Sequence, residues 1–232
     1  MNPAFIYFDL DDTLLDHRGA ETAALRDLYR QFPIFNGTDP DSLIEAYQRT
    51  NGELWKEYGK GNIGRSELQR KRFEHTLNQI GVDGSKYEEV GNYYMRAYQN
   101  HWSWVVGAYD ALKKVSGRYE TGILTNGFAE TQRSKIEQFS LDEFARHLVI
   151  SEEVGYLKPQ SEIFEHATSL VNRPPAEILY IGDSYRSDIV GGSSFGWKTA
   201  WYTGNNRNAP KESGRADFVF DDFQELCDLL EV

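Results

Sequence analysis

Cysteine is almost absent from this 232-residue sequence, which contains Cys227 and no other. A disulfide within the chain and a cysteine-rich metal site are therefore excluded. No apolar run approaches the roughly 20 residues that a helix needs to cross a bilayer. The N-terminus also lacks a basic segment followed by an apolar stretch, which is the pattern of a signal peptide. These absences predict a cytoplasmic protein, in a reducing compartment and without membrane contact.

Positive charge is also scarce. The sequence has 25 Lys and Arg residues against 36 Asp and Glu residues, a formal net charge of −11 at pH 7. This surplus of negative charge argues against a nucleic-acid polymer or an anionic membrane as the main partner. A small anionic substrate remains compatible with it, provided that a metal ion and a few basic side chains reverse the field locally.

The first apolar stretch ends in a group of carboxylates. Residues 4–8 are apolar and rich in aromatics, as expected of a buried strand, and Asp9, Asp11 and Asp12 follow. Because an unpaired carboxylate is costly to bury, we expect this group at a sheet edge, where the ends of parallel strands bind ligands. Asp9 and Asp11 could hold a hard cation such as Mg²⁺, and Asp9 could also act as a nucleophile. The alternative is an acidic turn with solvated side chains.

Residues 16–101 have the periodicity of helices. Apolar residues recur at helical spacing in four segments, and Gly, Pro and Asn residues separate them. The four segments are residues 20–31, 40–58, 66–80 and 85–101. We expect them to form a small α-helical bundle, inserted as a cap domain after the first strand.

From about residue 105 the pattern alternates between helix and strand. Short apolar strands are expected at residues 120–124, 147–150, 178–181, 198–202 and 218–220, with helices between them. Strands joined by helices imply a parallel sheet covered on both faces. The sequence therefore predicts an α/β, Rossmann-like core of residues 1–15 and 102–232, with the cap at 16–101. Residues 205–214 are polar and are expected to form a surface loop.

Further polar residues follow the other predicted strands. Thr125 ends the second strand, Lys158 lies in the loop after the third, and Asp183 follows the fourth. In a parallel sheet these side chains converge on the edge that carries Asp9 and Asp11. Such a set suits phosphoryl transfer, which depends mainly on positioning and on neutralising charge.

The motifs resemble those of the haloacid dehalogenase superfamily, in its phosphatases with a helical cap of the C1 type. The resemblance covers nearly the whole chain, and the motifs occur in family order. Within the superfamily, residues 125–128, 151–155 and 52–55 resemble the pyrimidine 5′-nucleotidase branch. The four family motifs are Asp9-Leu10-Asp11-Asp12-Thr13, Leu124-Thr125-Asn126-Gly127, Lys158-Pro159 and Gly182-Asp183-Ser184-Tyr185-Arg186-Ser187-Asp188.

The two leading acids have chemically distinct expected roles. Asp9 would attack phosphorus and form an aspartyl-phosphate, and one of its oxygens would also bind the metal. Asp11 would protonate the leaving alcohol and then activate water. By the resemblance, Asp11 also offers its backbone carbonyl to the metal. The alternative for Asp11 is a turn-forming residue.

The remaining motif residues would bind phosphate and metal. The Thr125 hydroxyl and the backbone N–H of Asn126 could hold phosphoryl oxygens, and Lys158 could neutralise the charge on phosphate and on Asp9. Asp183 would complete the Mg²⁺ shell with Asp9 and Asp11. Asp188 would lie in the second coordination shell, orienting Lys158 or a metal-bound water, or would be an acid favoured by a helix N-terminus.

The sequence thus predicts a Mg²⁺-dependent phosphoric monoester hydrolase. Its expected substrate is a small phosphorylated metabolite, and specifically a nucleoside 5′-monophosphate. One alternative is a phosphosugar or phosphoglycolate phosphatase, or a mutase, which would share the core motifs. Others are a 2-haloacid dehalogenase and a non-catalytic domain that binds phosphorylated ligands. Asp11 argues against both of these, because by resemblance the dehalogenases lack an acid there and binding alone needs none.

Weaker candidates for contact with substrate, from the cap or its hinge, are His17, Trp55, Lys56 and Arg65. An aromatic such as Trp55 would suit stacking on a base. An aromatic in a small helical bundle is, however, more often part of its core.

Overall fold

A computed structural model describes residues 2–204 and 214–232 of the chain. The chain divides into two compact units: the core unit, residues 1–16 and 104–232, and the helical unit, residues 17–103. The boundaries predicted from the sequence lie between residues 15 and 16 and between residues 101 and 102. Most of the expected surface loop at residues 205–214 lies outside the described residues.

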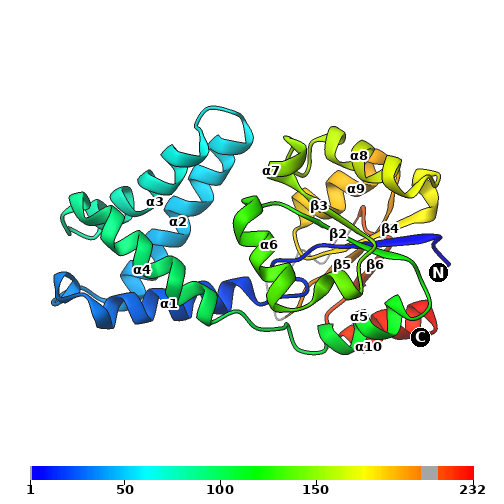
Figure 1. Ribbon diagram of the computed structural model, residues 1–232, viewed down its shortest axis with the longest axis horizontal. Coiled ribbons are helices and arrows are strands. Elements are labelled where there is room, and N and C mark those ends of the chain that lie inside the picture. Colours follow the sequence, from blue (N-terminus) through cyan, green and yellow to red (C-terminus); the bar gives the residue numbers. More distant parts are fainter. Residues whose placement is uncertain (1, 205–213) are drawn as a thin grey trace. The chain divides into compact units, whose positions relative to one another are not determined.

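The core unit is built on a parallel sheet, which confirms the predicted fold class (Figure 1). The strand order is β3-β2-β1-β4-β5-β6, and every neighbouring pair is parallel. The strands are β1 (Phe5–Phe8), β2 (Thr121–Thr125), β3 (His147–Ile150), β4 (Ile178–Gly182), β5 (Lys198–Tyr202) and β6 (Phe218–Phe220).

Helices cover both faces of this sheet (Figure 1). Those of the core unit are α5 (Ala108–Ser116), α6 (Ala129–Gln138), α7 (Ser151–Val154), α8 (Ser161–Val171), α9 (Gly191–Phe195) and α10 (Phe223–Leu230). A π-helix, Tyr185–Val190, precedes α9, where the sequence predicts a continuous helix from residue 188. Short 3₁₀ helices lie at Leu141–Glu143 and Pro175–Glu177.

Alternation along β1 explains how one strand serves both faces. Ile6 and Phe8 pack with apolar residues of α5, α6 and α10, whereas Phe5 and Tyr7 pack with residues of α8 on the opposite face. Successive side chains of a strand point to opposite faces, so a strand buried on both sides must be apolar throughout. All four residues of β1 are buried, and the strand holds the following acidic residues at the sheet edge.

The helical unit consists of α1 (His17–Gln31), α2 (Pro40–Gly59), α3 (Arg65–Gln79) and α4 (Tyr87–Asn100), with short 3₁₀ helices at Pro33–Phe35 and Gly84–Lys86. Its interior is aromatic: the ring of Tyr47 lies 5.4 Å from that of Phe73 and 5.1 Å from that of Tyr94. The Arg72 guanidinium lies over the Phe73 ring at 5.4 Å. This packing gives the insert a core of its own.

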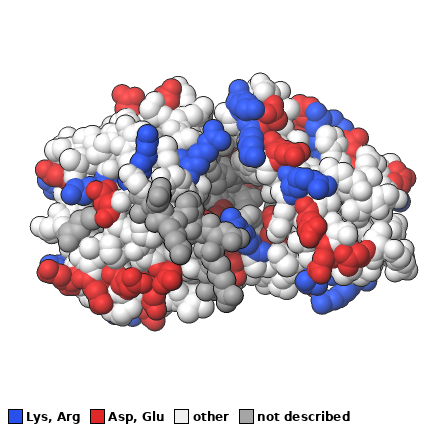
Figure 2. Space-filling view, turned by 180° about the vertical axis from the view of Figure 1, so that it is seen from behind, with Lys and Arg blue, Asp and Glu red and all other residues white. Residues whose placement is uncertain are grey.

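The surface of the core unit carries the negative charge of the sequence unevenly. In Figure 2, acidic side chains gather along the lower edge of the core unit, the edge at which Figure 1 places α10. The α10 segment contributes exposed Asp222, Glu225 and Asp228. No helix within the described residues is long and apolar enough to span a membrane.

Candidate active site

Residues that follow three parallel strands meet in the core unit. Asp9 follows β1, Thr125 ends β2, and Asp183 follows β4. Lys158, in the loop between α7 and α8, reaches Asp9. The sheet topology thus brings together residues from four distant parts of the sequence, at the edge where parallel sheets bind ligands.

Lys158 stands at the centre of a buried charged network. Its Nζ donates to Asp9 Oδ1 at 2.7 Å and to the Tyr180 hydroxyl at 2.6 Å, and lies 2.8 Å from Asp188 Oδ1. The Tyr180 hydroxyl in turn donates to the Leu124 carbonyl at 2.8 Å. A buried ammonium needs both charge partners and hydrogen-bond acceptors, and this network supplies them. The structure therefore holds the amine in one place.

Burial and neighbouring charges both shift the pKa values of the groups in this network. The pKa of Asp9 is raised to about 7, mainly by burial; Lys158 lowers it, and the Asp188 and Asp11 carboxylates add to the rise. Burial by itself would lower the pKa of Lys158, but the carboxylates of Asp188 and Asp9 outweigh burial and raise it. Lys158 is therefore cationic at neutral pH. Asp9 loses its proton more readily when further positive charge approaches it.

Three carboxylates of the site lie close enough to share a cation. One carboxylate oxygen from each of Asp9, Asp183 and Asp188 lies within 4.8 Å of the others. Hard oxygen donors at this spacing fit a small divalent cation. The Asp11 side chain is not part of this group. Asp188 is predicted from the sequence to lie in the second coordination shell. In the structure it contributes a carboxylate to this group and also contacts Lys158.

A glycine allows Asp188 to approach the end of β4. A Cβ at Gly182 would lie 2.4 Å from Asp188 Oδ2 and could not be accommodated there without movement of the carboxylate. The same oxygen accepts a hydrogen bond from the Ser184 backbone N–H at 2.9 Å. The Gly182-Asp183 motif thus supplies both the acid at the strand end and the space for a second acid.

Asp11 is held by two residues of α6. Lys135 Nζ lies 2.5 Å from Asp11 Oδ1, and Gln132 Nε2 donates to Asp11 Oδ2 at 3.1 Å. Gln132 Nε2 also donates to Thr125 Oγ1 at 2.7 Å. Neither Gln132 nor Lys135 was predicted from the sequence. The sequence offers one indication of their role: they are polar and three residues apart, so they share a face of a helix that should bury an apolar face.

The turn after β2 is fixed by side chains from neighbouring loops. The Asn126 side chain makes reciprocal hydrogen bonds with the Lys158 backbone, as donor to its carbonyl at 3.0 Å and acceptor from its N–H at 2.8 Å. The Gly127 N–H donates to Ser151 Oγ at 3.0 Å, and the Ala129 N–H donates to Glu152 Oε2 at 2.7 Å. The structure thus joins the Thr125-Asn126 turn to the loop that carries Lys158. The phosphate-binding role of these residues stays a prediction.

The four weaker candidates all lie in the helical unit. His17 Nδ1 is 2.6 Å from the Tyr98 hydroxyl, and the Trp55 ring packs edge-on against Tyr58. Lys56 is exposed on α2, and Arg65 begins α3. The contacts of His17 with Tyr98 and of Trp55 with Tyr58 both lie within the unit.

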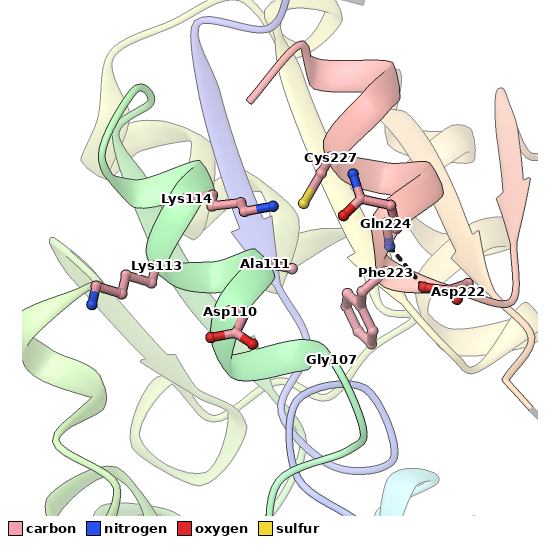
Figure 3. Close-up of a pocket in the computed structure, with 9 residues that line it drawn as sticks. All are labelled: Gly107, Asp110, Ala111, Lys113, Lys114, Asp222, Phe223, Gln224 and Cys227. Carbon is pink, nitrogen blue, oxygen red and sulfur yellow. Dashed lines mark hydrogen bonds between the residues drawn. The ribbon is translucent and has the colours of Figure 1, made fainter.

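A cavity of about 360 Å³ lies elsewhere in the core unit, between α5 and α10. The residues that line it are Gly107, Asp110, Ala111, Lys113, Lys114, Asp222, Phe223, Gln224 and Cys227 (Figure 3). Asp222 is engaged as a helix cap, accepting the Gln224 N–H at 2.8 Å. Burial raises the pKa of the Cys227 thiol, which disfavours the reactive thiolate. The surroundings of Cys227 therefore do not activate its thiol as a nucleophile.

Comparison with known proteins agrees with this arrangement. The family model described as "haloacid dehalogenase-like hydrolase" matches residues 5–196. Pyrimidine 5′-nucleotidase YjjG of Escherichia coli is 32% identical over 208 residues, 89% of each chain. A glyceraldehyde 3-phosphate phosphatase of Pyrococcus furiosus is 32% identical over 234 residues, covering 97% of this chain and 92% of the relative.

A solved structure is similar over its whole length. The crystal structure of the putative HAD-hydrolase YfnB of Bacillus subtilis, bound to magnesium, superposes with a TM-score of 0.86 at 26% identity and covers 100% of both chains. The sequence-based resemblance, including that to the pyrimidine 5′-nucleotidase branch, is therefore confirmed. With a family model that matches most of its length and relatives that span it, the chain belongs to the haloacid dehalogenase-like hydrolase family.

Proposed function

We propose that this hydrolase is a Mg²⁺-dependent phosphatase that cleaves a nucleoside 5′-monophosphate through an aspartyl-phosphate at Asp9. The enzyme class expected from the sequence, a phosphoric monoester hydrolase, is borne out by relatives named as a nucleotidase and phosphatases. The nucleotide substrate is the finer part of the proposal. It rests on similarity to the pyrimidine 5′-nucleotidase of Escherichia coli.

The observation that carries the proposal is the placement of two aspartates with different surroundings. Asp9 lies buried against Lys158, and the Asp11 side chain, which is 25% exposed, is held by Lys135. A nucleophile needs positioning and charge compensation, whereas a general acid must reach the leaving oxygen. A dehalogenase expels halide and has no alkoxide to protonate. Asp11 therefore favours the phosphatase.

The reaction would proceed in two displacements. In the first, an Asp9 oxygen bonds to phosphorus, the ester P–O bond breaks, and Asp11 gives its proton to the leaving alkoxide. In the second, water attacks phosphorus, its proton passes to Asp11, and the Asp9–phosphorus bond breaks. Lys158 would balance negative charge on the phosphoryl group while holding Asp9 in line.

The metal would be held by Asp9, Asp183 and the backbone carbonyl of Asp11. A bound Mg²⁺ would supply positive charge to the phosphoryl oxygens. Both carboxylate oxygens of Asp188 already contact Lys158 or the Ser184 N–H, so we propose that Asp188 orients Lys158. Thr125 and the Asn126 N–H would hold phosphoryl oxygens at the end of β2.

Phosphate release tests this proposal. The purified protein should hydrolyse p-nitrophenyl phosphate with Mg²⁺ and lose activity with EDTA, and Asp9→Asn should abolish turnover. Asp142→Asn, which changes an exposed aspartate of the core unit, is the matched control and should retain activity. Turnover without metal, or by Asp9→Asn, would contradict the mechanism.

A panel of phosphate esters tests the substrate. We expect higher kcat/KM for pyrimidine nucleoside 5′-monophosphates than for sugar phosphates or phosphoglycolate. The glyceraldehyde 3-phosphate phosphatases at similar identity make the sugar phosphates the sharpest competitors. A preference for those esters would overturn the nucleotide assignment and leave the phosphatase in place.

A further inference from the structure

We propose that Lys135 and Gln132 are positioning residues that hold the Asp11 carboxyl group in its working orientation. This inference rests on the proposed function, in which Asp11 is the general acid and base. Neither residue belongs to the sequence motifs that point to the family. Both lie on α6, more than 120 residues from Asp11 in the chain.

The burial of Lys135 calls for an explanation. Lys135 and Gln132 are each 1% exposed, although lysine is almost never fully buried unless it is paired. The Lys135 ammonium lies 2.5 Å from Asp11 Oδ1. The Asp11 side chain is 25% exposed and that of Lys135 only 2%, so the cation approaches from the protein interior. The accessible side of the carboxyl group is left to face a substrate.

Gln132 connects this carboxyl group to the end of β2. Its Nε2 reaches Asp11 Oδ2 at 3.1 Å and Thr125 Oγ1 at 2.7 Å. A Cβ at Gly127 would lie 2.8 Å from the side-chain carbons of Gln132, so the glycine makes room for it. Residues of one helix, α6, thus contact both carboxylate oxygens of Asp11. Because Gln132 also binds Thr125, the same contacts fix Asp11 relative to Thr125, which is the proposed phosphate ligand.

A structural ion pair and a positioning device predict different kinetics. p-Nitrophenolate leaves with the electron pair of the broken P–O bond and needs no proton. Formation of the aspartyl-phosphate at Asp9 from p-nitrophenyl phosphate should therefore depend little on Asp11. Hydrolysis of that intermediate still needs Asp11, because the attacking water must lose a proton.

Rapid-mixing kinetics of Lys135→Met with p-nitrophenyl phosphate and Mg²⁺ test the inference. We expect a burst of about one p-nitrophenolate per enzyme at near the wild-type rate, followed by turnover that is about 10- to 100-fold slower, within the range of general acid–base effects. With a nucleoside 5′-monophosphate, whose leaving group needs a proton, the first step should slow as well. General damage to the site would instead reduce the burst rate and amplitude.

A double-mutant cycle separates the inference from the proposed function. If Lys135 acts through Asp11, adding Lys135→Met to Asp11→Asn should cause no further loss. Lys135→Arg should recover most of the turnover. Arg133→Met, which removes an exposed cation from the same helix, should leave the kinetics unchanged.

Two outcomes would overturn the inference: wild-type turnover by Lys135→Met, or losses that multiply in the double mutant. An Asp11→Asn protein with wild-type turnover would instead overturn the role of Asp11 in the proposed function. If Lys135→Met does not fold, Gln132→Leu provides the second test. It should show the same burst, with a turnover loss of about 3- to 10-fold because a neutral hydrogen bond is weaker than a charged one.

Discussion

The side-chain amide of Asn126 forms two hydrogen bonds with the backbone of Lys158. Its nitrogen donates to the Lys158 carbonyl at 3.0 Å, and its oxygen accepts from the Lys158 N–H at 2.8 Å. One amide group thus satisfies a donor and an acceptor of a loop residue 32 positions away in the sequence. The position of the Lys158 amine therefore depends on the turn that follows Thr125.

Asn126→Ala should impair catalysis more than folding. The variant loses both bonds, and we expect a destabilisation of about 1–3 kcal/mol, because the Lys158 backbone groups lose their partners. We expect kcat on p-nitrophenyl phosphate to fall about 10-fold or more, since small misplacements of a catalytic group are costly. Steady-state kinetics and urea unfolding measure the two effects. Gln138→Ala, an exposed change in α6, is the control, and equal kcat values for both variants would contradict the role of Asn126.

Lys158→Met should be both inactive and strongly destabilised. It leaves the buried carboxylates of Asp9 and Asp188 without their shared cation, and breaking a buried pair from one side typically costs about 3–5 kcal/mol. Adding Asp188→Asn should recover part of the free energy of unfolding but no activity. Urea denaturation of metal-free protein measures this, with the exposed Lys113→Met as control. A Lys158→Met protein as stable as wild type would rule out a buried charged network.

The raised pKa of Asp9 predicts a pH-dependent stability. Burial raises this pKa from 3.8 to about 7, so between these values the folded protein binds a proton that the unfolded chain releases. The contribution of Asp9 to stability is therefore present below about pH 4, is lost as pH rises to about 7, and stays lost above it. Asp9→Asn removes this dependence. Without metal, the variant should gain stability relative to wild type across that interval, by at most about 4 kcal/mol.

Urea unfolding of both proteins from pH 4 to pH 8, with EDTA present, provides the measurement. A stability difference that does not change with pH would contradict the raised pKa. Asp142→Asn controls for the loss of an exposed carboxylate. Mg²⁺ should stabilise the wild-type protein more at pH 8 than at pH 5, because the ion competes with the proton at Asp9.

Asp39→Ala should weaken the start of α2 without changing the chemistry. Asp39 Oδ2 accepts hydrogen bonds from the Ser42 N–H at 2.9 Å and the Ser42 hydroxyl at 3.0 Å. Loss of an N-cap typically costs about 1 kcal/mol. Hydrogen exchange should show faster opening of the first turn of α2, while Glu45→Ala, an exposed change within α2, should not. Unchanged exchange in Asp39→Ala would show that the cap does not limit opening.

Much of the fold followed from local patterns. The apolar residues of β1 and the alternation of strands and helices after residue 105 led to a parallel sheet, which the structure contains. Burial on both faces makes such strands apolar throughout, and helices show their spacing, so both signals are local in the sequence. The π-helix at Tyr185–Val190 was missed because its pattern resembles that of an α-helix.

Chain order and residue type led to the prediction that Asp9, Asp11, Asp183 and Lys158 serve one site. Asp9, Thr125 and Asp183 each occupy a strand end, and the parallel sheet brings those ends together. Contacts such as Lys135–Asp11 and Asn126–Lys158 have no local sequence pattern that predicts them. The partners are 124 and 32 residues apart, and nothing near them in the sequence distinguishes them from other polar pairs. Tyr180 looked like one more apolar residue of a buried strand, yet its hydroxyl contacts Lys158.

By itself, the sequence determined the sheet, the helical insert and the acidic strand ends, since each depends on residues that are neighbours in the chain. Only the tertiary structure decided which side chains surround Asp9 and Asp11. It gave Asp9 a buried lysine that it shares with Asp188, and it gave Asp11 a lysine and a glutamine from α6. The physical reason is that burial and charge compensation depend on what packs around a group in space.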